Sequence, residues 1–187
     1  MPLSTVLGAQ SLVQPAVCTT ATRPASPYTG QAIYDTTVSQ VLVYNGTAFA
    51  PVSRVLQSLF TSTTTSATSA STTYVTTNLA QVITPSSSDS KVKIQANILG
   101  YRDTNGGELG LRIVRTIGAT STTLVTIGQA ATGNAAVGLV AIQWVDSPAT
   151  TSATTYTVHF ARSSGTGNVV VQQGSGTSTM VVEEISA

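Results

Sequence analysis

Short apolar runs separated by turn residues fill the second half of the chain. Between residues 91 and 98, apolar and polar side chains alternate strictly, which is typical of a strand with one buried face. Similar runs predict eight strands, at Tyr74–Ile83, Lys91–Leu99, Glu108–Thr116, Thr122–Ile127, Leu139–Val145, Thr155–Phe160, Asn168–Gln172 and Thr179–Ile185. Eight short strands at this spacing predict a jelly-roll-like sandwich of two four-stranded sheets.

The first half of the chain contains a smaller β pattern. Ile33–Asp35 and Gln40–Tyr44 are short apolar and aromatic runs, and Asn45-Gly46 follows the second run as a strong hairpin signal. The stretch before them is rich in proline and has little tendency to form a helix. The sequence therefore predicts a small β-meander here.

These patterns divide the chain into four parts. Residues 1–22 show no clear period and are expected to form an extended arm, and residues 23–60 are expected to form the small β unit. Within residues 61–73, eleven of thirteen side chains carry a hydroxyl, which predicts a joint without core residues. Residues 74–187 are the expected jelly-roll domain. Residues 53–60 could form a helical turn or a strand, because so short a segment has no decisive period.

The composition favours an all-β protein that assembles with other subunits. Ser and Thr together number 55, only 8% of the residues are charged, and the mean hydropathy is +0.23. This combination argues against disorder and for half-buried pleated surfaces. The net charge of +1, with scattered basic residues, argues against a nucleic-acid partner. A surface so poor in charge suits a subunit covered by identical neighbours, so we expect an oligomer.

Few residues could carry catalytic or metal chemistry. His159 is the one histidine and Cys18 the one cysteine, so the chain lacks the Cys and His ligands of a zinc site. His159 is also the only imidazole that could act as the base of a catalytic triad. Glu183 and Glu184 are adjacent on a predicted strand and should point to opposite faces instead of converging on a sugar. We therefore expect no enzyme activity, no bound metal and no cofactor.

The start of the chain does not have the pattern of a targeting signal. Residues 1–21 are mildly apolar but lack a basic leading segment, so no secretory signal is expected. No apolar run approaches the roughly 20 residues of a membrane-spanning helix. We therefore expect no membrane partner.

The order of residues from Arg23 to Val52 resembles a module found in virion structural proteins of tailed bacteriophages. It contains a Pro-rich entry, Gly-Gln, Ile-Tyr-Asp-Thr, Val-Tyr-Asn-Gly, and an aromatic residue followed by Val. Phe49 stands where those proteins commonly have Trp, which keeps the ring and removes the indole donor. The resemblance covers this module alone and implies a virion component.

A looser resemblance is carried by the segments PSSSDSKVKIQANILG and STMVVEEI. It is to the C-terminal β domains of phage head-decoration and fibre proteins, which look like trimeric jelly rolls. Together the resemblances imply a capsid decoration (cement) protein, made in the bacterial cytoplasm and placed on the virion, at the capsid surface in preference to the tail. The implied partners are the major capsid protein or another virion protein, and further copies of the chain in a homotrimer. The candidate contact residues are Arg23, Tyr34, Asp35, Tyr44, Asn45 and Phe49.

Two alternatives stay open at this point. The chain could be a tail or head fibre module that binds host surface glycans, with Trp144 as the only indole that could stack on a sugar. Its strand position beside Val140 and Ile142 predicts a core residue instead. Likewise, the aromatic residues of the small β unit fit core packing as well as they fit partner contacts.

Overall fold

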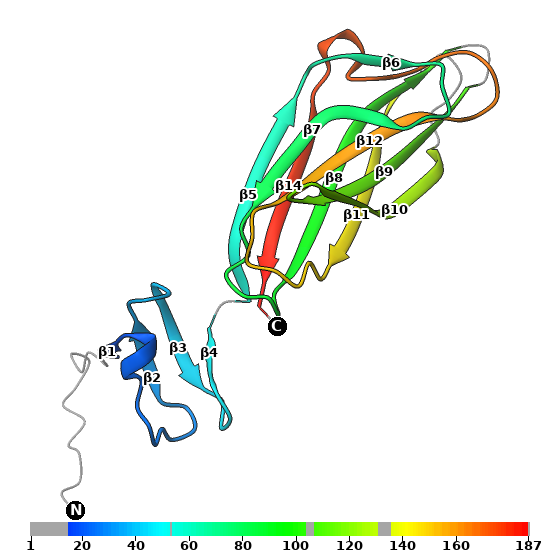
Figure 1. Ribbon diagram of the computed structural model, residues 1–187. Helices are drawn as coiled ribbons and strands as arrows, with labels where there is room; N and C mark the ends of the chain where they lie inside the picture. The colour runs from blue at the N-terminus through cyan, green and yellow to red at the C-terminus, as the bar shows by residue number, and fades with distance from the viewer. Residues whose placement is uncertain (1–14, 53, 104–106, 131–135, 187) are drawn as a thin grey trace, which may run out of the picture. The chain divides into compact units, whose positions relative to one another are not determined.

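The computed structural model describes residues 15–52, 54–103, 107–130 and 136–186, without the side chains of residues 129 and 130. In these residues the chain is all-β, as predicted, and forms three sheets (Figure 1). It divides into two compact units, Met1–Arg54 and Val55–Ala187. Among the described helices, none is long and apolar enough to cross a membrane.

The first unit is a four-stranded sheet in the order β1-β2-β3-β4. Its strands are β1 (Ala16–Cys18), β2 (Ala32–Asp35), β3 (Gln40–Tyr44) and β4 (Phe49–Pro51). β2, β3 and β4 form the predicted antiparallel meander, and β1 pairs with β2 in parallel. The short helix η2 (Thr20–Thr22) follows β1. The last part of the expected arm therefore belongs to the sheet, and residues 1–14 lie outside the described residues.

In the second unit, β8 (Lys91–Arg102) lies at the centre of a six-stranded sheet. It pairs along its length with β11 (Val137–Asp146). Its other partners are β14 (Ser178–Ile185) and β13 (Val169–Val171). Outside these two strands lie β5 (Val55–Thr63) and β6 (Ala67–Ser69).

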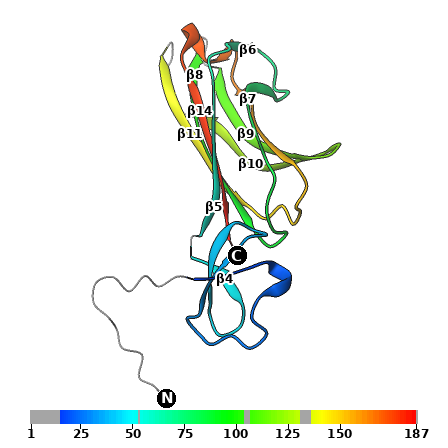
Figure 2. The same ribbon diagram turned by 90° about the vertical axis from the view of Figure 1, so that its left-hand side faces the viewer.

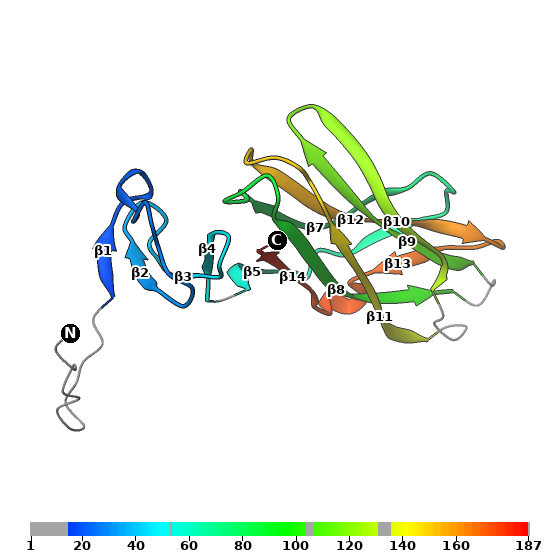
Figure 3. The same cartoon turned by 90° about the horizontal axis from the view of Figure 1, so that it is seen from below.

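A four-stranded sheet forms the second layer, in the order β10-β9-β12-β7. Its strands are β10 (Thr120–Ala130), β9 (Glu108–Ile117), β12 (Thr154–Ser164) and β7 (Val75–Ile83). The two sheets pack face to face, as Figures 2 and 3 show, and they enclose one apolar core. The largest fully buried side chains of this core are Tyr156, Phe160, Leu79, Ile83, Ile94, Ile98, Leu109, Leu111, Ile113, Ile142 and Met180.

All eight predicted strands are present in the second unit, and several are longer than expected. The division of the chain differs from the expected one, because strand β5 begins at Val55 and β6 lies within the hydroxyl-rich segment 61–73. Residues 55–60 thus belong to a strand and do not form a helical turn. Threonine is β-branched and fits an extended backbone, so a Thr-rich segment can pair at a sheet edge instead of forming a joint. The sandwich accordingly has six and four strands where four and four were expected.

Candidate functional site

One face of the small sheet is closed by its own side chains. Ile33 and Leu42 face each other across β2 and β3 and are 0% and 3% exposed. On the same face, the rings of Tyr44 and Phe49 pack with their centroids 5.3 Å apart. Side chains that alternate along neighbouring strands share a face, so these four form a small core.

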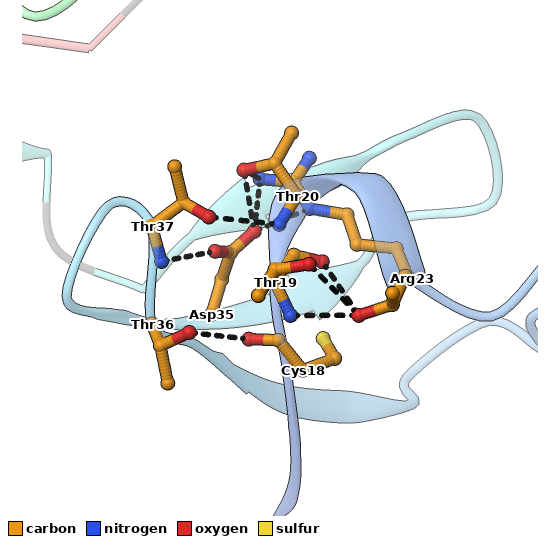
Figure 4. Close-up of polar contacts among 8 residues, drawn as sticks. Cys18, Thr19, Thr20, Arg23, Asp35, Thr36 and Thr37 are labelled. Atoms are coloured by element: carbon orange, nitrogen blue, oxygen red, sulfur yellow. Dashed lines mark hydrogen bonds and ion pairs between the residues drawn. The ribbon is translucent and has the colours of Figure 1, made fainter.

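Asp35 is the polar centre of this closed face (Figure 4). It is 0% exposed, and its Oδ2 accepts from Arg23 Nε at 2.7 Å and Nη2 at 2.6 Å, and from Thr20 Oγ1 at 2.9 Å. Its Oδ1 accepts from the backbone N–H of Thr37 at 2.8 Å. Burial by itself raises the pKa of Asp35, but these hydrogen bonds and the charge of Arg23 hold it below its ordinary value.

This arrangement defines what two of the predicted contact residues do within the chain. Arg23 and Asp35 contact each other, and they bind the segment after β1 onto the end of β2. The Asp35 carboxylate is fully enclosed and presents no surface of its own. A Cys18 carbonyl that accepts from the N–H of Thr36 at 2.8 Å completes the attachment. Any contact of these two residues with a partner stays a prediction.

Asn45 also has a local role. Its Oδ1 accepts from the backbone N–H groups of Thr47 and Ala48, both at 2.9 Å. Gly46 takes a φ of +100°, which a side chain would disfavour. The predicted hairpin is confirmed, but its loop runs over four residues because Tyr44 pairs directly with Phe49.

The opposite face of the small sheet is apolar and open. The pairing register places seven apolar side chains there, and no charged side chain shares their rows. The seven, which we call the apolar face, are Val17, Ala32, Tyr34, Val41, Val43, Ala50 and Val52. Val17, Val41 and Val52 are 63%, 43% and 68% exposed. Tyr34 is the one member among the contact residues predicted from the sequence. The sequence signal for this face is the unbroken apolar run Val41-Leu42-Val43, which makes both faces of the strand apolar.

The second unit places the remaining candidate residues on separate faces. Glu184 is fully buried, and it accepts from Gln57 Nε2 at 2.6 Å and from the N–H and hydroxyl of Ser86, both at 2.7 Å. Its neighbour Glu183 points the other way and pairs with Lys93 at 3.2 Å. The expected divergence of the two glutamates is therefore confirmed.

His159 lies on the outer face of the four-stranded sheet, opposite Arg112 on β9. Burial lowers the pKa of His159, and the charge of Arg112 lowers it further. The guanidinium of Arg112 lies over the ring of Tyr74, 4.4 Å from its centre. Within the described part of the chain, no three His, Cys, Asp or Glu side chains come together as a metal site would require.

Trp144 is not in the core, contrary to the prediction from its strand position. It is 42% exposed and, with Lys93, Gln143 and Val145, lines a shallow depression. The physical reason is its place on β11, which pairs with β8 alone among the described strands. A side chain on the inner side of an edge strand is covered from one side only.

Comparison with known proteins adds similarities of structure. No model of a protein family matches the chain, and no curated protein matches it. A structure of T=1 particles derived from infectious bursal disease virus is similar over 75% of this chain and 39% of that one, with 14% identity and a TM-score of 0.39. A VP2 subviral particle of the same virus matches 88% of this chain and 46% of that one, with 14% identity and a TM-score of 0.37. The chain spans less than half of these proteins, and at TM-scores below 0.5 the similarity carries no inference about function.

Proposed function

We propose that the chain is a non-enzymatic structural protein of a bacteriophage virion, a capsid decoration or cement subunit that docks on the shell through its small sheet. The major capsid protein is the proposed partner, and the second unit is proposed to self-associate as a trimer at the capsid surface. The observation that carries the proposal is the apolar face of the small sheet. The phage-module resemblance of the same residues supports it.

The physical argument is the contrast between the two faces of one sheet. The core of this small sheet, formed by Ile33 and Leu42, contributes little stabilisation. The apolar side chains of the open second face add stabilisation only if another surface covers them. Between residues 15 and 54 the charged residues are Arg23, Asp35 and Arg54, and the first two neutralise each other. A partner for this unit is therefore recognised by shape and apolar contact, with little contribution from charge.

Substitution within the apolar face tests this docking role. Val41→Lys places a charge on a side chain that is 43% exposed, and Val75→Lys on β7 is the matched control with the same exposure. Burial of one valine contributes about 1.5 kcal/mol or more, so we expect Val41→Lys to weaken binding about tenfold or more. The control should bind like the wild type.

The binding partner for this test is a particle of the encoding phage assembled without the chain. Purified full-length protein is added, bound protein is measured by co-sedimentation, and gold-labelled protein is located by electron microscopy. Equal binding by wild type and Val41→Lys would overturn docking through the apolar face. Label on the tail instead of the head would overturn the decoration role.

Glycan binding by a fibre module is the second candidate, and the exposure of Trp144 favours it. An exposed indole in a shallow depression that Gln143 and Lys93 also line offers a stacking surface to a sugar. Binding of the full chain to an array of bacterial surface glycans, lost in Trp144→Ala, would support this candidate. If the wild-type chain gave no array signal above that of Trp144→Ala, glycan binding would be rejected.

A further inference from the structure

The β sandwich has four long edge strands, and one of them differs from the others. β5, β7 and β10 each break register with their neighbour, and the extra residues lie on the edge strand itself. β11 pairs with β8 without any shift from Val137 to Asp146. Bulges on edge strands prevent pairing with other chains. Of these four long edges, β11 alone lacks this protection.

The side chains of β11 also lack the usual protection. From residue 137 to 146 the strand has no proline and no basic residue, and its single charged side chain is Asp146. Asp146 turns inward, where it accepts from Arg115 at 2.9 Å and from the Tyr156 hydroxyl at 2.8 Å. The side chains left outside are uncharged and, apart from Gln143, apolar, with Leu139 67% and Val145 52% exposed. A long, regular, uncharged edge is a template for another strand.

We propose that β11 pairs antiparallel with β11 of a second copy of this chain, about a two-fold axis at Ile142. This register places Leu139 of each copy opposite Val145 of the other on the outer face. On the inner face it places Val140 opposite Trp144, which covers the exposed indole. The strand carries no outward charge, so two copies meet without repulsion, and the exposed Leu139, Trp144 and Val145 each lie opposite an apolar partner.

This contact goes beyond the proposed docking function and does not depend on it. It joins two six-stranded sheets into one continuous sheet, whether or not a shell is present. On a decorated shell, a two-fold contact of this kind would link copies that belong to neighbouring trimers. Because pairing covers Trp144, it also excludes sugar binding at the same strand.

Cross-linking between engineered cysteines tests the register. In a full-length Cys18→Ser background, Leu139→Cys with Val145→Cys should give a covalent dimer under mild oxidation, because directly opposite Cβ atoms lie about 5 Å apart. Within one chain the two positions are about 20 Å apart along the strand, so they cannot join each other. Leu139→Cys alone should stay monomeric on a non-reducing gel, because its symmetry mate is equally distant. No dimer from the double variant, or equal dimer from the single one, would overturn the proposal.

Sedimentation velocity of the full chain tests the surface independently. We expect a concentration-dependent pairing, of single chains or of trimers, that Leu139→Lys weakens about tenfold or more, because two lysines enter each interface. Phe60→Lys on β5 is the matched control, since Phe60 is 66% exposed, and it should associate like the wild type. Circular dichroism establishes that each variant is folded. A wild type that shows no concentration-dependent pairing, or an equal loss in both variants, would overturn the pairing of β11.

Discussion

The contact between Asp146, Arg115 and Tyr156 should hold one end of the β sandwich together. Asp146 lies at the end of β11 in the six-stranded sheet, whereas Arg115 and Tyr156 lie on β9 and β12 in the other sheet. Arg115 Nη1 donates to both carboxylate oxygens, at 2.9 Å and 3.0 Å, and the Tyr156 hydroxyl donates to Oδ2 at 2.8 Å. Burial, and then Asp146, raise the pKa of Tyr156 well above its usual range, so its hydroxyl remains a donor.

Asp146→Ala would leave both donors without this partner. The side chains of Asp146 and Arg115 are 7% and 19% exposed, and Tyr156 is completely buried. Removing one member of a buried pair costs about 3 to 5 kcal/mol, and the partial exposure of Arg115 favours the lower end. At about 3 °C per kcal/mol for a unit of this size, we expect a decrease of roughly 10 °C in Tm.

The single tryptophan provides a selective assay, because Trp144 lies in the second unit two residues before Asp146. Its fluorescence during thermal and urea unfolding therefore reports on that unit. Tyr156→Phe should cost about 1.5 kcal/mol, since it removes one hydrogen bond to a charged group. Asp89→Ala, at an exposed carboxylate, should change stability by less than about 0.5 kcal/mol. A loss below about 1 kcal/mol in Asp146→Ala would refute the cross-sheet role.

Three further predictions concern titratable groups. Burial alone would raise the pKa of Glu184, but hydrogen bonds hold this pKa below 4.5. The stabilisation that the ionised carboxylate contributes is therefore present above pH 4.5 and is lost as the pH falls through the pKa of the folded state. In urea titrations from pH 7 to 3, the difference in free energy of unfolding between Glu184→Gln and the wild type should therefore become smaller as the pH falls. The pKa of His159 is lowered from 6.5 by burial and then by Arg112, so the unfolded state binds more protons than the folded state. The free energy of unfolding should therefore decrease as the pH is lowered from 6.5, and His159→Gln should reduce this pH dependence. Asp35→Asn should speed amide hydrogen exchange in residues 19–23 relative to the meander, and unchanged exchange would contradict its role.

The strands of the second unit were predictable because each combines apolar alternation with flanking turn residues. The strand Lys91–Arg102 shows this best, since its buried positions are the even-numbered apolar residues of the sequence. The strand at residues 55–63 stayed open between a helical turn and a strand, and the strand at residues 67–69 was not predicted, because short or hydroxyl-rich segments carry no decisive apolar period. Their place in the sheet depends on the distant partners β14 and β13, which local sequence does not reveal.

The residues of the small sheet were predictable as a group but not in their roles. A sequence gives the alternation of a strand, but it does not say which neighbour covers each face. Aspartate is usually exposed, but Asp35 is buried because Arg23 and Thr20, more than ten residues earlier, pair with its carboxylate. Val17 joins the apolar face only through the parallel pairing of a three-residue strand, which no local signal indicates.

The placement of charge predicts how this protein associates. Arg23–Asp35, Lys93–Glu183, Arg102–Glu108 and Arg115–Asp146 are four ion pairs among the described residues, so most of the chain's few charges are neutralised internally. The apolar face and β11 are left without charge, and such contacts are insensitive to ionic screening. We therefore expect the dissociation constant from sedimentation to change less than about threefold between about 0.05 M and 0.5 M NaCl. A strong weakening with salt would mean that charged residues outside these two surfaces carry the association, and would contradict pairing through β11.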